Sequence, residues 1–433
     1  MEPKVAIALF VFVTVYVFLS TERIHRTKAT LAGASIFIIA GIVSQQKAFA
    51  SVDFNTIFLL LGMMVLVNVT KETGIFEFVA IKGLKIAKGD PWKILIIFYF
   101  LTAIISAFLD NVTTVILFAP IVLFVSDVLR IPSFPYLVSL ILAANIGGTA
   151  TLIGAPPNIM IASASGYDFL DFFFHVFPIA ILILLVNLVL LWLFFRKSFQ
   201  KHDGAEAVKL DANKALKDKK LLIKAIIVLI LTIVGFTLHG LLNIEPATVA
   251  MSGAALMLLL IKGDPARFFE KVEWNTLFFF GGLFVLVGGL EQVGVIEEIF
   301  KYLTHLTDNV AVLSMIFLFG GALCCSFIDN IPFTAMMIPL VSRIVEHIFP
   351  STLGAAETNA AAVGSMALWW SLSLGANLGG NGTIIAASPN VVLSGIAEQS
   401  GNKIKFSKYF KYGITSVLIS TVVAAVYVWL RYL

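Results

Sequence analysis

Charged side chains are scarce in this sequence. Asp, Glu, Lys and Arg make up 13% of its 433 residues, whereas hydrophobic residues make up 59%. A soluble globular domain carries about 25% charged residues, so that class of protein is excluded. Apolar runs of membrane-spanning length recur along the chain, which predicts an all-α polytopic protein in a lipid bilayer. The net charge of +4 does not predict a nucleic-acid partner, because the lysines and arginines lie in short loops.

Cysteine is rare, and the usual nucleotide and catalytic motifs are missing. Cys324 and Cys325 are neighbours in an apolar run, where helical side chains point apart, so we expect neither a disulfide nor a thiolate metal site. No GxxxxGK[ST] loop, His-Glu metal motif or Gly-x-Ser-x-Gly elbow occurs, which argues against an ATPase and against an intramembrane enzyme. We expect no cofactor except Na⁺ or H⁺ as coupling ion. Energy would come from an ion gradient or a separate ATPase subunit.

The sequence does contain two similar sets of apolar segments. The first set covers 5–20, 28–44, 54–70, 94–109, 112–128, 136–164 and 174–195, and the second covers 221–239, 247–261, 274–290, 310–328, 331–348, 359–397 and 409–430. The segments 136–164 and 359–397 are each interrupted by Gly, Thr and Pro. We expect a first repeat in 1–197, a cytoplasmic polar linker in 198–220 and a second repeat in 221–433. Residues 5–19 lack the flanks of a cleaved signal peptide, which predicts a retained helix.

Three motifs recur in both halves, in the same order and at nearly constant spacing. They are VDFNTIF at 52–58 and VEWNTLF at 272–278, FLDNV at 108–112 and FIDNI at 327–331, and NIGGTATLIGAPPN at 145–158 and NLGGNGTIIAASPN at 377–390. Gene duplication is the simplest explanation. Broken apolar segments at matching positions of two halves indicate the binding site of a transporter.

The second half is predicted to be inverted relative to the first. The segments on either side of each Asp-Asn pair form a hairpin, either spanning or re-entrant, which leaves five other crossings per half and therefore an odd number. With both termini outside, 24 of the 30 Lys and Arg residues fall in predicted cytoplasmic loops, as the positive-inside rule requires. Residues 75–89 and 295–306 mix apolar and charged residues at helical spacing and predict interfacial helices that join a fixed part to a moving part.

The Asp-Asn pairs at 110–111 and 329–330 are the most costly residues in the apolar runs, and a carboxylate in hydrocarbon indicates a functional site. If the hairpins are re-entrant, we expect both tips and both breaks to converge near the midplane. The alternative is that each Asp-Asn pair is a surface turn that caps the next helix. Asn55 and Asn275 are interpreted as helix caps, and the histidines near span ends as interfacial residues.

The half-helices after the breaks are expected to present free N–H groups to an anion. Amides of Asn111, Asn145, Asn330 and Asn377, together with unwound carbonyls, suit Na⁺, and the glycines would let the backbone approach the solute. The candidate ligands are Asp110, Asn111, Thr113, Thr114, Asn145, Gly147, Gly148, Thr149, Thr151, Pro157 and Asn158 in the first half, and Asp329, Asn330, Thr334, Asn377, Gly379, Gly380, Asn381, Thr383, Pro389 and Asn390 in the second. Asp110 and Asp329 would carry the coupling proton or cation.

The motifs SAFLDNVTT, NIGGTATLIGAPPN, SFIDNIPFTAMMIP and GANLGGNGTIIAASPNVVLSGIAEQSG resemble the ion transporter superfamily. Within it they look most like the branch of arsenite permeases, D-type sodium–proton antiporters and the melanosomal P protein, with a citrate-transporter-like membrane domain. The resemblance implies two inverted repeats, re-entrant hairpins, scaffold and transport domains, an elevator mechanism and a homodimer. Related sodium–dicarboxylate symporters carry Ser-Asn-Thr where this chain has Asp110-Asn111-Val112 and Asp329-Asn330-Ile331.

Two carboxylates would repel a di- or tricarboxylate. We therefore expect a secondary transporter of a small inorganic solute, with arsenite or oxyanion efflux coupled to protons as the first interpretation. Na⁺/H⁺ antiport through the same aspartates is the alternative, and a passive anion channel is a further one. The expected location is the plasma membrane of a bacterium or archaeon.

Overall fold

The computed structural model describes residues 3–21, 23–199, 212–262, 264–350 and 359–433, and it contains no strand in these ranges. The helices of the first half are α1 (Pro3–Thr21), α2 (Arg26–Ile39), α3 (Gln45–Ala50), α4 (Phe54–Glu72), α5 (Ile75–Ala87), α6 (Pro91–Ser106), α7 (Asn111–Val128), α8 (Phe134–Thr149), α9 (Pro156–Ser165), α10 (Phe169–His175), α11 (Phe177–Phe195) and the 3₁₀ turn η1 (Arg196–Ser198).

The second half follows the 3₁₀ turn η3 (Ala212–Ala215). Its helices are α12 (Lys219–Leu242), α13 (Pro246–Leu260), α14 (Ala266–Phe269), α15 (Trp274–Gln292), α16 (Val295–Leu306), α17 (Val310–Met315), the π-helical turn η4 (Ile316–Gly320), α18 (Gly321–Cys325), α19 (Asn330–Ile348), α20 (Asn359–Gly379), α21 (Ser388–Gln399) and α22 (Phe406–Tyr432).

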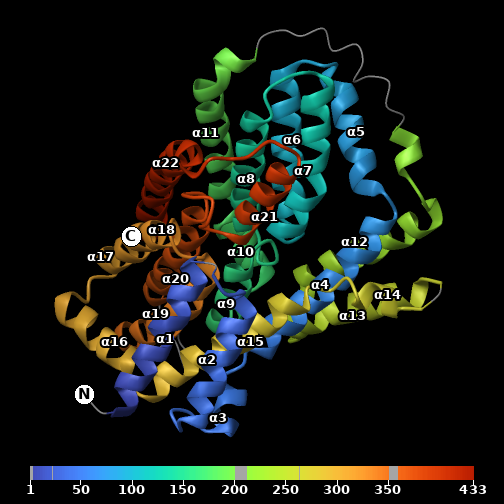
Figure 1. The fold of residues 1–433 in the computed structure, drawn as a ribbon. Helices are drawn as coiled ribbons and strands as arrows, with labels where there is room; N and C mark the ends of the chain where they lie inside the picture. The colour runs from blue at the N-terminus through green and yellow to red at the C-terminus, as the bar shows by residue number, and fades with distance from the viewer. Residues whose placement is uncertain (1–2, 22, 200–211, 263, 351–358) are drawn as a thin grey trace.

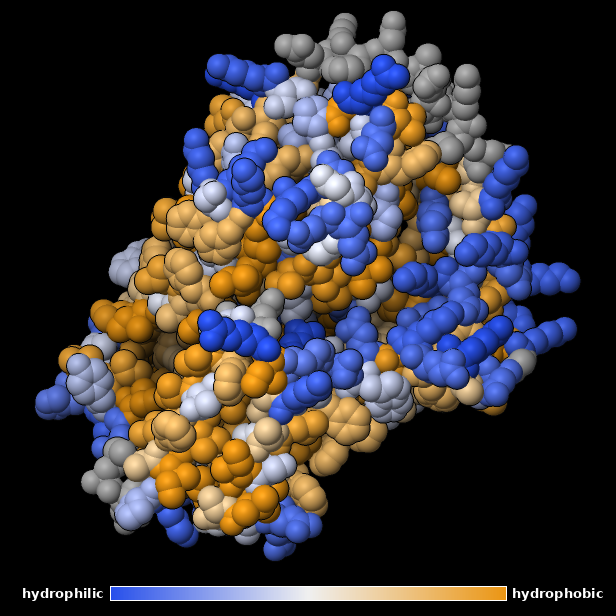
Figure 2. Space-filling model, viewed as in Figure 1, coloured by the Kyte–Doolittle hydropathy of each residue, from blue (hydrophilic) through white to orange (hydrophobic). Residues whose placement is uncertain are grey.

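Seven of the described helices are long and apolar enough to cross a membrane, and five shorter apolar helices accompany them. Large hydrophobic side chains stay exposed along α11, α12 and α22, such as Val189, Ile230 and Val426, each more than half exposed. Figure 2 shows broad apolar surfaces next to a charged region over α12–α14. Because exposed apolar faces of this size need a lipid environment, the prediction of an all-α polytopic membrane protein is confirmed.

The helices pack as two groups that contact each other through α4 and α9 and through α15 and α19; in Figure 1, α12–α14 lie to the lower right of α6–α8. The α4 group contains α1–α4 and α12–α15, in which α4 packs on α13 and α2 packs on α15. The α8 group contains α6–α11 and α17–α22, in which α8 packs on α6 and α20 packs on α18. Each group therefore takes helices from both halves of the sequence.

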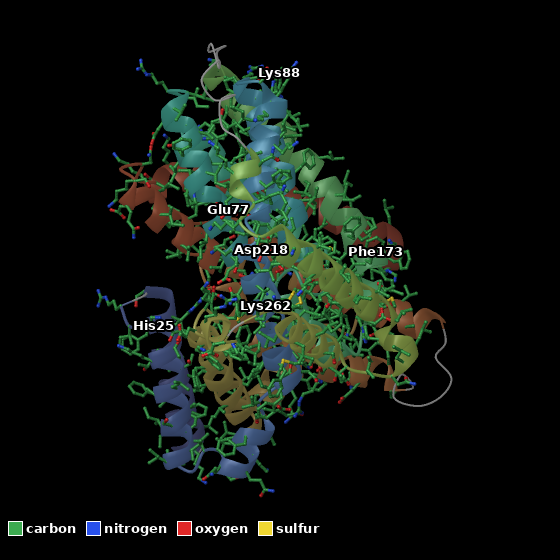
Figure 3. All side chains as sticks on the ribbon, turned by 90° about the vertical axis from the view of Figure 1, so that its right-hand side faces the viewer. His25, Glu77, Lys88, Phe173, Asp218 and Lys262 are labelled. Carbon is green, nitrogen blue, oxygen red and sulfur yellow. The ribbon has the colours of Figure 1, made fainter. Side chains whose placement is uncertain are left out.

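Two helices connect the groups. After α4 the chain turns at Gly74 into α5, and after α15 it turns at Gly294 into α16; both glycines have a positive φ, +77° and +79°, which glycine adopts without strain. The helices predicted at 75–89 and 295–306 are thus confirmed. The linker end contacts the first of these joints, where Lys217 N–H donates to Thr73 O (3.0 Å). Figure 3 shows Asp218, the next residue, below Glu77 of α5.

The prediction that Asn55 and Asn275 cap their helices is wrong. Both lie one residue inside the helix, and the capping positions of α4 and α15 are held by Asp53 and Glu273. Asp53 accepts a hydrogen bond from Thr56 N–H (3.2 Å), as an N-cap carboxylate does. A cap two residues earlier is within the usual uncertainty of reading a helix start from sequence.

Candidate functional site

The two predicted breaks are present, between α8 and α9 and between α20 and α21. A break exposes backbone carbonyls that must find donors in an apolar interior. In the first break the Asn158 side-chain amide donates to Gly148 O (3.4 Å), Thr149 O (2.9 Å) and Thr151 O (2.8 Å). One fully buried asparagine therefore closes the first break.

The second break is closed in the same way. The Asn390 amide donates to Gly380 O (2.7 Å) and Thr383 O (2.9 Å). Asn390 is also fully buried, and it matches Asn158 at the shift of 232 that relates the two motifs. The Pro-Asn that ends each motif thus supplies a donor for the carbonyls that its own break exposes.

The two breaks are joined by a reciprocal pair of amide hydrogen bonds. Asn145 Nδ2 donates to Asn390 Oδ1 (3.1 Å), and Asn377 Nδ2 donates to Asn158 Oδ1 (2.8 Å). Asn145 also reaches Asn381 Oδ1 (3.0 Å). All five side chains are at most 2% exposed. The predicted convergence of the breaks is therefore found, as an asparagine cluster that links the halves.

The hairpin tips lie beside this cluster through Asn111 and Asn330. Asn111 packs where a Cβ on Gly148 would stand, and Asn330 Nδ2 lies 3.6 Å from the Cβ position of Gly380. With the Asn111 amide nitrogen toward Gly154 O (3.0 Å), Ser106 Oγ (2.7 Å) and Ala144 O (3.2 Å), both of its hydrogens have acceptors. This orientation, assigned from hydrogen bonding, turns its oxygen toward Asn145.

Asp110 and Asp329 cap the helices that follow them. Asp110 accepts hydrogen bonds from Val112 N–H (2.8 Å) and Thr113 N–H (3.3 Å), and Asp329 accepts one from Ile331 N–H (2.9 Å). Both side chains are partly exposed to cavities. Each carboxylate can therefore cap its helix and still bind a proton, cation or solute, because it keeps free lone pairs.

The two carboxylates do not share a cavity. Asp329 opens into a cavity of ≈ 300 Å³, which is also lined by Arg26, Ser388 and Phe279. Asp110 opens into one of ≈ 40 Å³. The residues of the α4 group that line this smaller cavity include Asn68, Lys271 and Glu273, and Thr113 lines it from the hairpin.

Most of the predicted hydroxyl ligands are already bonded to backbone. Thr149 donates to Asn145 O, Thr114 to Asp110 O and Thr334 to Asn330 O, each four residues back. Thr151 and Thr383 connect the breaks to the hairpins through Ala107 O and Ser326 O. These hydroxyls retain only acceptor capacity for a solute.

The glycine pairs serve close packing. A Cβ on Gly147 would meet Ala103 O at 2.3 Å, and one on Gly379 would meet Ala322 O at 2.7 Å. These two glycines let α8 approach α6, and α20 approach α18. Gly148 instead makes room for the Asn111 side chain, whereas a Cβ on Gly380 would stand at ordinary contact distance from Asn330 Nδ2.

The predicted anion site at the half-helix N-termini is wrong for α9. That helix begins with Pro156-Pro157, which have no N–H, and Asn158 N–H bonds to Ala155 O (3.0 Å). Pro389 removes the equivalent donor from α21 and leaves Ser388 N–H as the only donor before Asn390 N–H, which bonds to Ala387 O (3.0 Å). The prolines at 156, 157 and 389 are present in the sequence and argue against this site.

Sequence reasoning missed Arg26, Ser388 and Glu273. Arg26 was counted as a loop charge, although it is the first residue of α2 and its guanidinium lines the larger cavity. Ser388 belongs to the Ser-Pro-Asn that ends the second motif, where the first motif has Pro. This exchange of Pro for Ser, directly before the Pro-Asn that both motifs share, was the available signal.

Comparison with known proteins places these features in a family. Residues 16–375 match the citrate transporter family (CitMHS). The chain is 41% identical to an uncharacterized transporter of Mycobacterium tuberculosis over 98% of each chain, and 31% identical to the P protein of Mus musculus over all of this chain and 61% of that protein. The fold is similar to that of the YdaH transporter of Alcanivorax borkumensis, with a TM-score of 0.57, 14% identity and coverage of 92% and 88%.

Proposed function

The chain belongs to the citrate transporter family, and we propose that it is a cation-coupled secondary transporter of a small inorganic solute, with efflux of arsenite against protons as its reaction. Asp110 carries the coupling proton or cation. Asp329, with the groups around it, contacts the solute. The asparagine cluster forms the rigid centre that holds both hairpin tips.

The unequal cavities carry this proposal. A volume of ≈ 40 Å³ at Asp110 suits a proton, a bare cation or a water, because one water needs about 10–15 Å³ of such space. The ≈ 300 Å³ cavity at Asp329 has room for a small solute. Its polar side chains are Asp329, Arg26, Ser388 and His25, and its remaining wall is apolar.

This lining favours a neutral hydroxylated solute. Ser388 Oγ already donates its hydrogen to Asp329 Oδ2 (3.2 Å). Arsenous acid can donate hydrogen bonds to Asp329 and accept them from Arg26, which match the remaining donor and acceptor on this wall. A tricarboxylate would instead place several negative charges beside Asp329 with one arginine to offset them. Although the family is named for citrate, these residues support an uncharged substrate.

Na⁺/H⁺ antiport is the second candidate, and the amide oxygens favour it. Asn377 Oδ1 is buried and has no hydrogen-bond donor among the described residues. Asn145 Oδ1 lies 3.4 Å from the amide of Asn111, whose preferred orientation turns its oxygen that way. Oxygens without donors, one in each half, suit Na⁺. The residues that would hold Na⁺ are Asn111, Asn145 and Asn377, and Asn330 stays a predicted fourth ligand.

An elevator of inverted repeats is part of the proposal. Its support is reciprocal packing: α4–α13 matches α2–α15, α7–α21 matches α9–α19, and α8–α11 matches α20–α22. The α4 group would be the scaffold and the α8 group the moving part, with α5 and α16 as arms. Arg26 and Lys271, from predicted cytoplasmic loops, line the two carboxylate cavities, which supports a cytoplasm-facing state.

Proton flux in proteoliposomes separates the candidates. Purified protein is reconstituted with a pH-sensitive dye inside, and NaCl, arsenite and citrate are added in turn. We expect proton movement with arsenite only. Proton movement with NaCl alone would replace this function by Na⁺/H⁺ antiport, movement with citrate alone would restore the carboxylate substrate, and no movement under any gradient would contradict coupled transport.

A further inference from the structure

Arg26 contacts the tip of the second hairpin across the boundary between the two helix groups. Its Nη1 lies 4.0 Å from Asp329 Oδ2 and donates to Ser388 Oγ. The guanidinium also lies over the Phe279 ring, 5.4 Å from its centroid. The Arg26 and Asp329 side chains are 30% and 20% exposed, so the pair is mostly shielded from water. Such shielding strengthens the attraction between the charges.

Tyr16 supports the same contact from α1. Its hydroxyl donates to Pro332 O in the first turn of α19 (2.7 Å). The sequence at the hairpin tip, Asp329 to Pro332, is therefore held by α1 and α2 together. Arg26 also ties α21 to the same place through Ser388, so one side chain joins α2 to both moving elements.

The first hairpin lacks this arrangement. The shift of 220 that relates the halves takes Arg26 to Pro246 and Tyr16 to Phe236, neither of which has a side-chain donor. In the part of the chain that the structure describes, no ion pair to Asp110 is found, and the nearby Lys271 pairs with Glu72 (2.5 Å). The tie to the scaffold is therefore specific to the second half.

We propose that Arg26 is a positioning residue, a tethered cation that docks the second hairpin tip on α2 and holds the transporter in the conformation described. The proposal rests on the proposed function in one respect, that the α8 group moves past the α4 group. A carboxylate that leaves its arginine in an apolar interior is unpaired and costly. The hairpin can therefore leave α2 readily only when solute or cation takes the place of the guanidinium, which links loading to movement.

The test measures access to the cavity and requires no transport. Val392, which lines the cavity beside Asp329, is replaced by Val392→Cys in a protein that carries Cys324→Ala and Cys325→Ala. The rate of alkylation by N-ethylmaleimide is then measured in purified protein. Arg26→Gln should raise this rate at least about fivefold. The reason is that a shielded ion pair is expected to stabilise the docked state at least as much as the strongest exposed ion pairs do. Arg23→Gln replaces an exposed arginine in the turn before α2; it is the matched control and should change nothing.

Two further variants keep the result interpretable. Arg26→Lys retains the cation and should label close to the slow rate. Arg26→Asp combined with Asp329→Arg reverses the pair and should label more slowly than either single variant. Wild-type labelling of Arg26→Gln, or labelling of Arg26→Lys as fast as Arg26→Gln, would overturn the proposal. If labelling follows the expectation but no gradient drives proton flux, the transport function fails and the docking role stands.

Discussion

At the residue scale, the asparagines of the repeated motifs have two kinds of role. Asn158 and Asn390 close the helix breaks, whereas Asn145 and Asn377 join the halves. The Asn145 oxygen also faces Asn111 at the first hairpin tip. The sequence placed all four in one site because they recur at one spacing. It could not show which amides are already used by backbone, since that depends on how each break turns.

We predict that Asn158→Leu destabilises the protein by about 3 kcal/mol, because buried carbonyls lose their donor. The measurement is the unfolding transition of the purified protein in detergent. Asn309→Ala, which removes an exposed cap from α17, is the control and should cost about 1 kcal/mol. If Asn158→Leu unfolds like the wild type and loses only transport, Asn158 is a ligand and not a structural residue.

Asp110→Asn and Asp329→Asn are each predicted to abolish uphill transport and leave the protein folded. Asparagine caps a helix about as well as aspartate, so α7 and α19 should keep their first turns, and only the charge is lost. Thermal unfolding near that of the wild type, together with zero accumulation in vesicles, is the expected pair of results. Gradient-driven accumulation at the wild-type rate in both variants would remove the aspartates from the mechanism.

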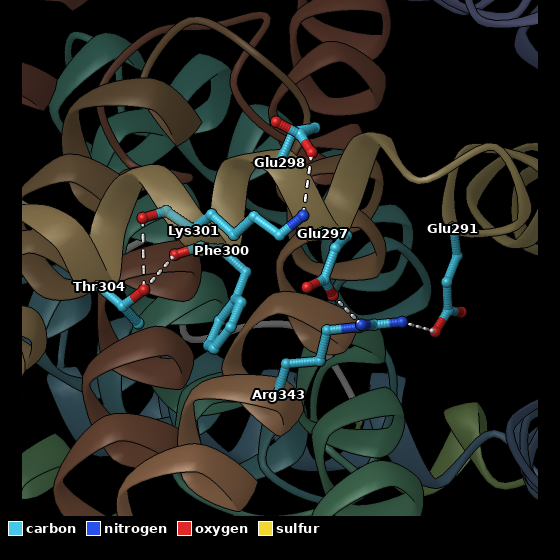
Figure 4. Close-up of polar contacts among 7 residues, drawn as sticks. All are labelled: Glu291, Glu297, Glu298, Phe300, Lys301, Thr304 and Arg343. Atoms are coloured by element: carbon cyan, nitrogen blue, oxygen red, sulfur yellow. Dashed lines mark hydrogen bonds and ion pairs between the residues drawn. The ribbon is translucent and has the colours of Figure 1, made fainter.

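At the element scale, α16 is joined to its neighbours by one arginine, shown in Figure 4. Arg343 of α19 pairs with Glu297 of α16 and with Glu291 of α15 (3.4 Å). We predict that Arg343→Gln lowers stability by about 0.5 kcal/mol, since these side chains are about one-third exposed and partly screened. Lys301→Gln removes the fully surface pair with Glu298 and is the control. An equal effect of the two variants in thermal unfolding would contradict a special role for Arg343.

The two arm joints differ although both turn at glycine. A Cβ on Gly74 would lie 1.8 Å from Ala215 O, whereas Gly294 has open space around it. In both Gly74→Ala and Gly294→Ala, alanine at a positive φ lowers stability by about 1 kcal/mol. Only Gly74→Ala must also displace residues 212–217. We predict faster tryptic cleavage after Lys217 in Gly74→Ala than in Gly294→Ala. Equal cleavage would show that the linker end does not depend on this contact.

The sequence predicted which helices, breaks and hairpins exist more reliably than it predicted which of them contact one another. Both breaks, both hairpins and both arm helices were readable, since each has a local signature of Gly, Pro, Asp-Asn or mixed polarity. Arg26 was not, because its partners Asp329 and Ser388 are distant in sequence and only the packing of α2 against the second hairpin brings them together. The double proline before Asn158 was local and was overlooked.

At the scale of the whole molecule, two helix groups each combine both halves of the chain, and polar contacts cross between them at few places. The Arg26–Asp329 pair, the Tyr16–Pro332 hydrogen bond and the Arg343–Glu291 pair connect the α4 group with the second hairpin. Among the described residues, the first hairpin packs on α4 through the apolar cluster of Val67, Leu109 and Leu117, and Asp110 lines the small cavity without an ion pair to the α4 group. This unequal attachment of the two hairpins is what we expect if the α8 group alternates between two positions against the α4 group and the structure describes one of them.

The most direct measurement is uphill uptake by reconstituted protein. Vesicles with an acidic lumen are given radioactive arsenite outside, with the membrane voltage clamped at zero, and arsenite and luminal pH are followed together. Coupled exchange predicts that arsenite accumulates above its outside concentration while protons leave, and that Asp110→Asn does neither. Arsenite entry that stops at equal concentrations, or that follows an imposed voltage with no proton movement, would contradict coupled transport and indicate a passive channel.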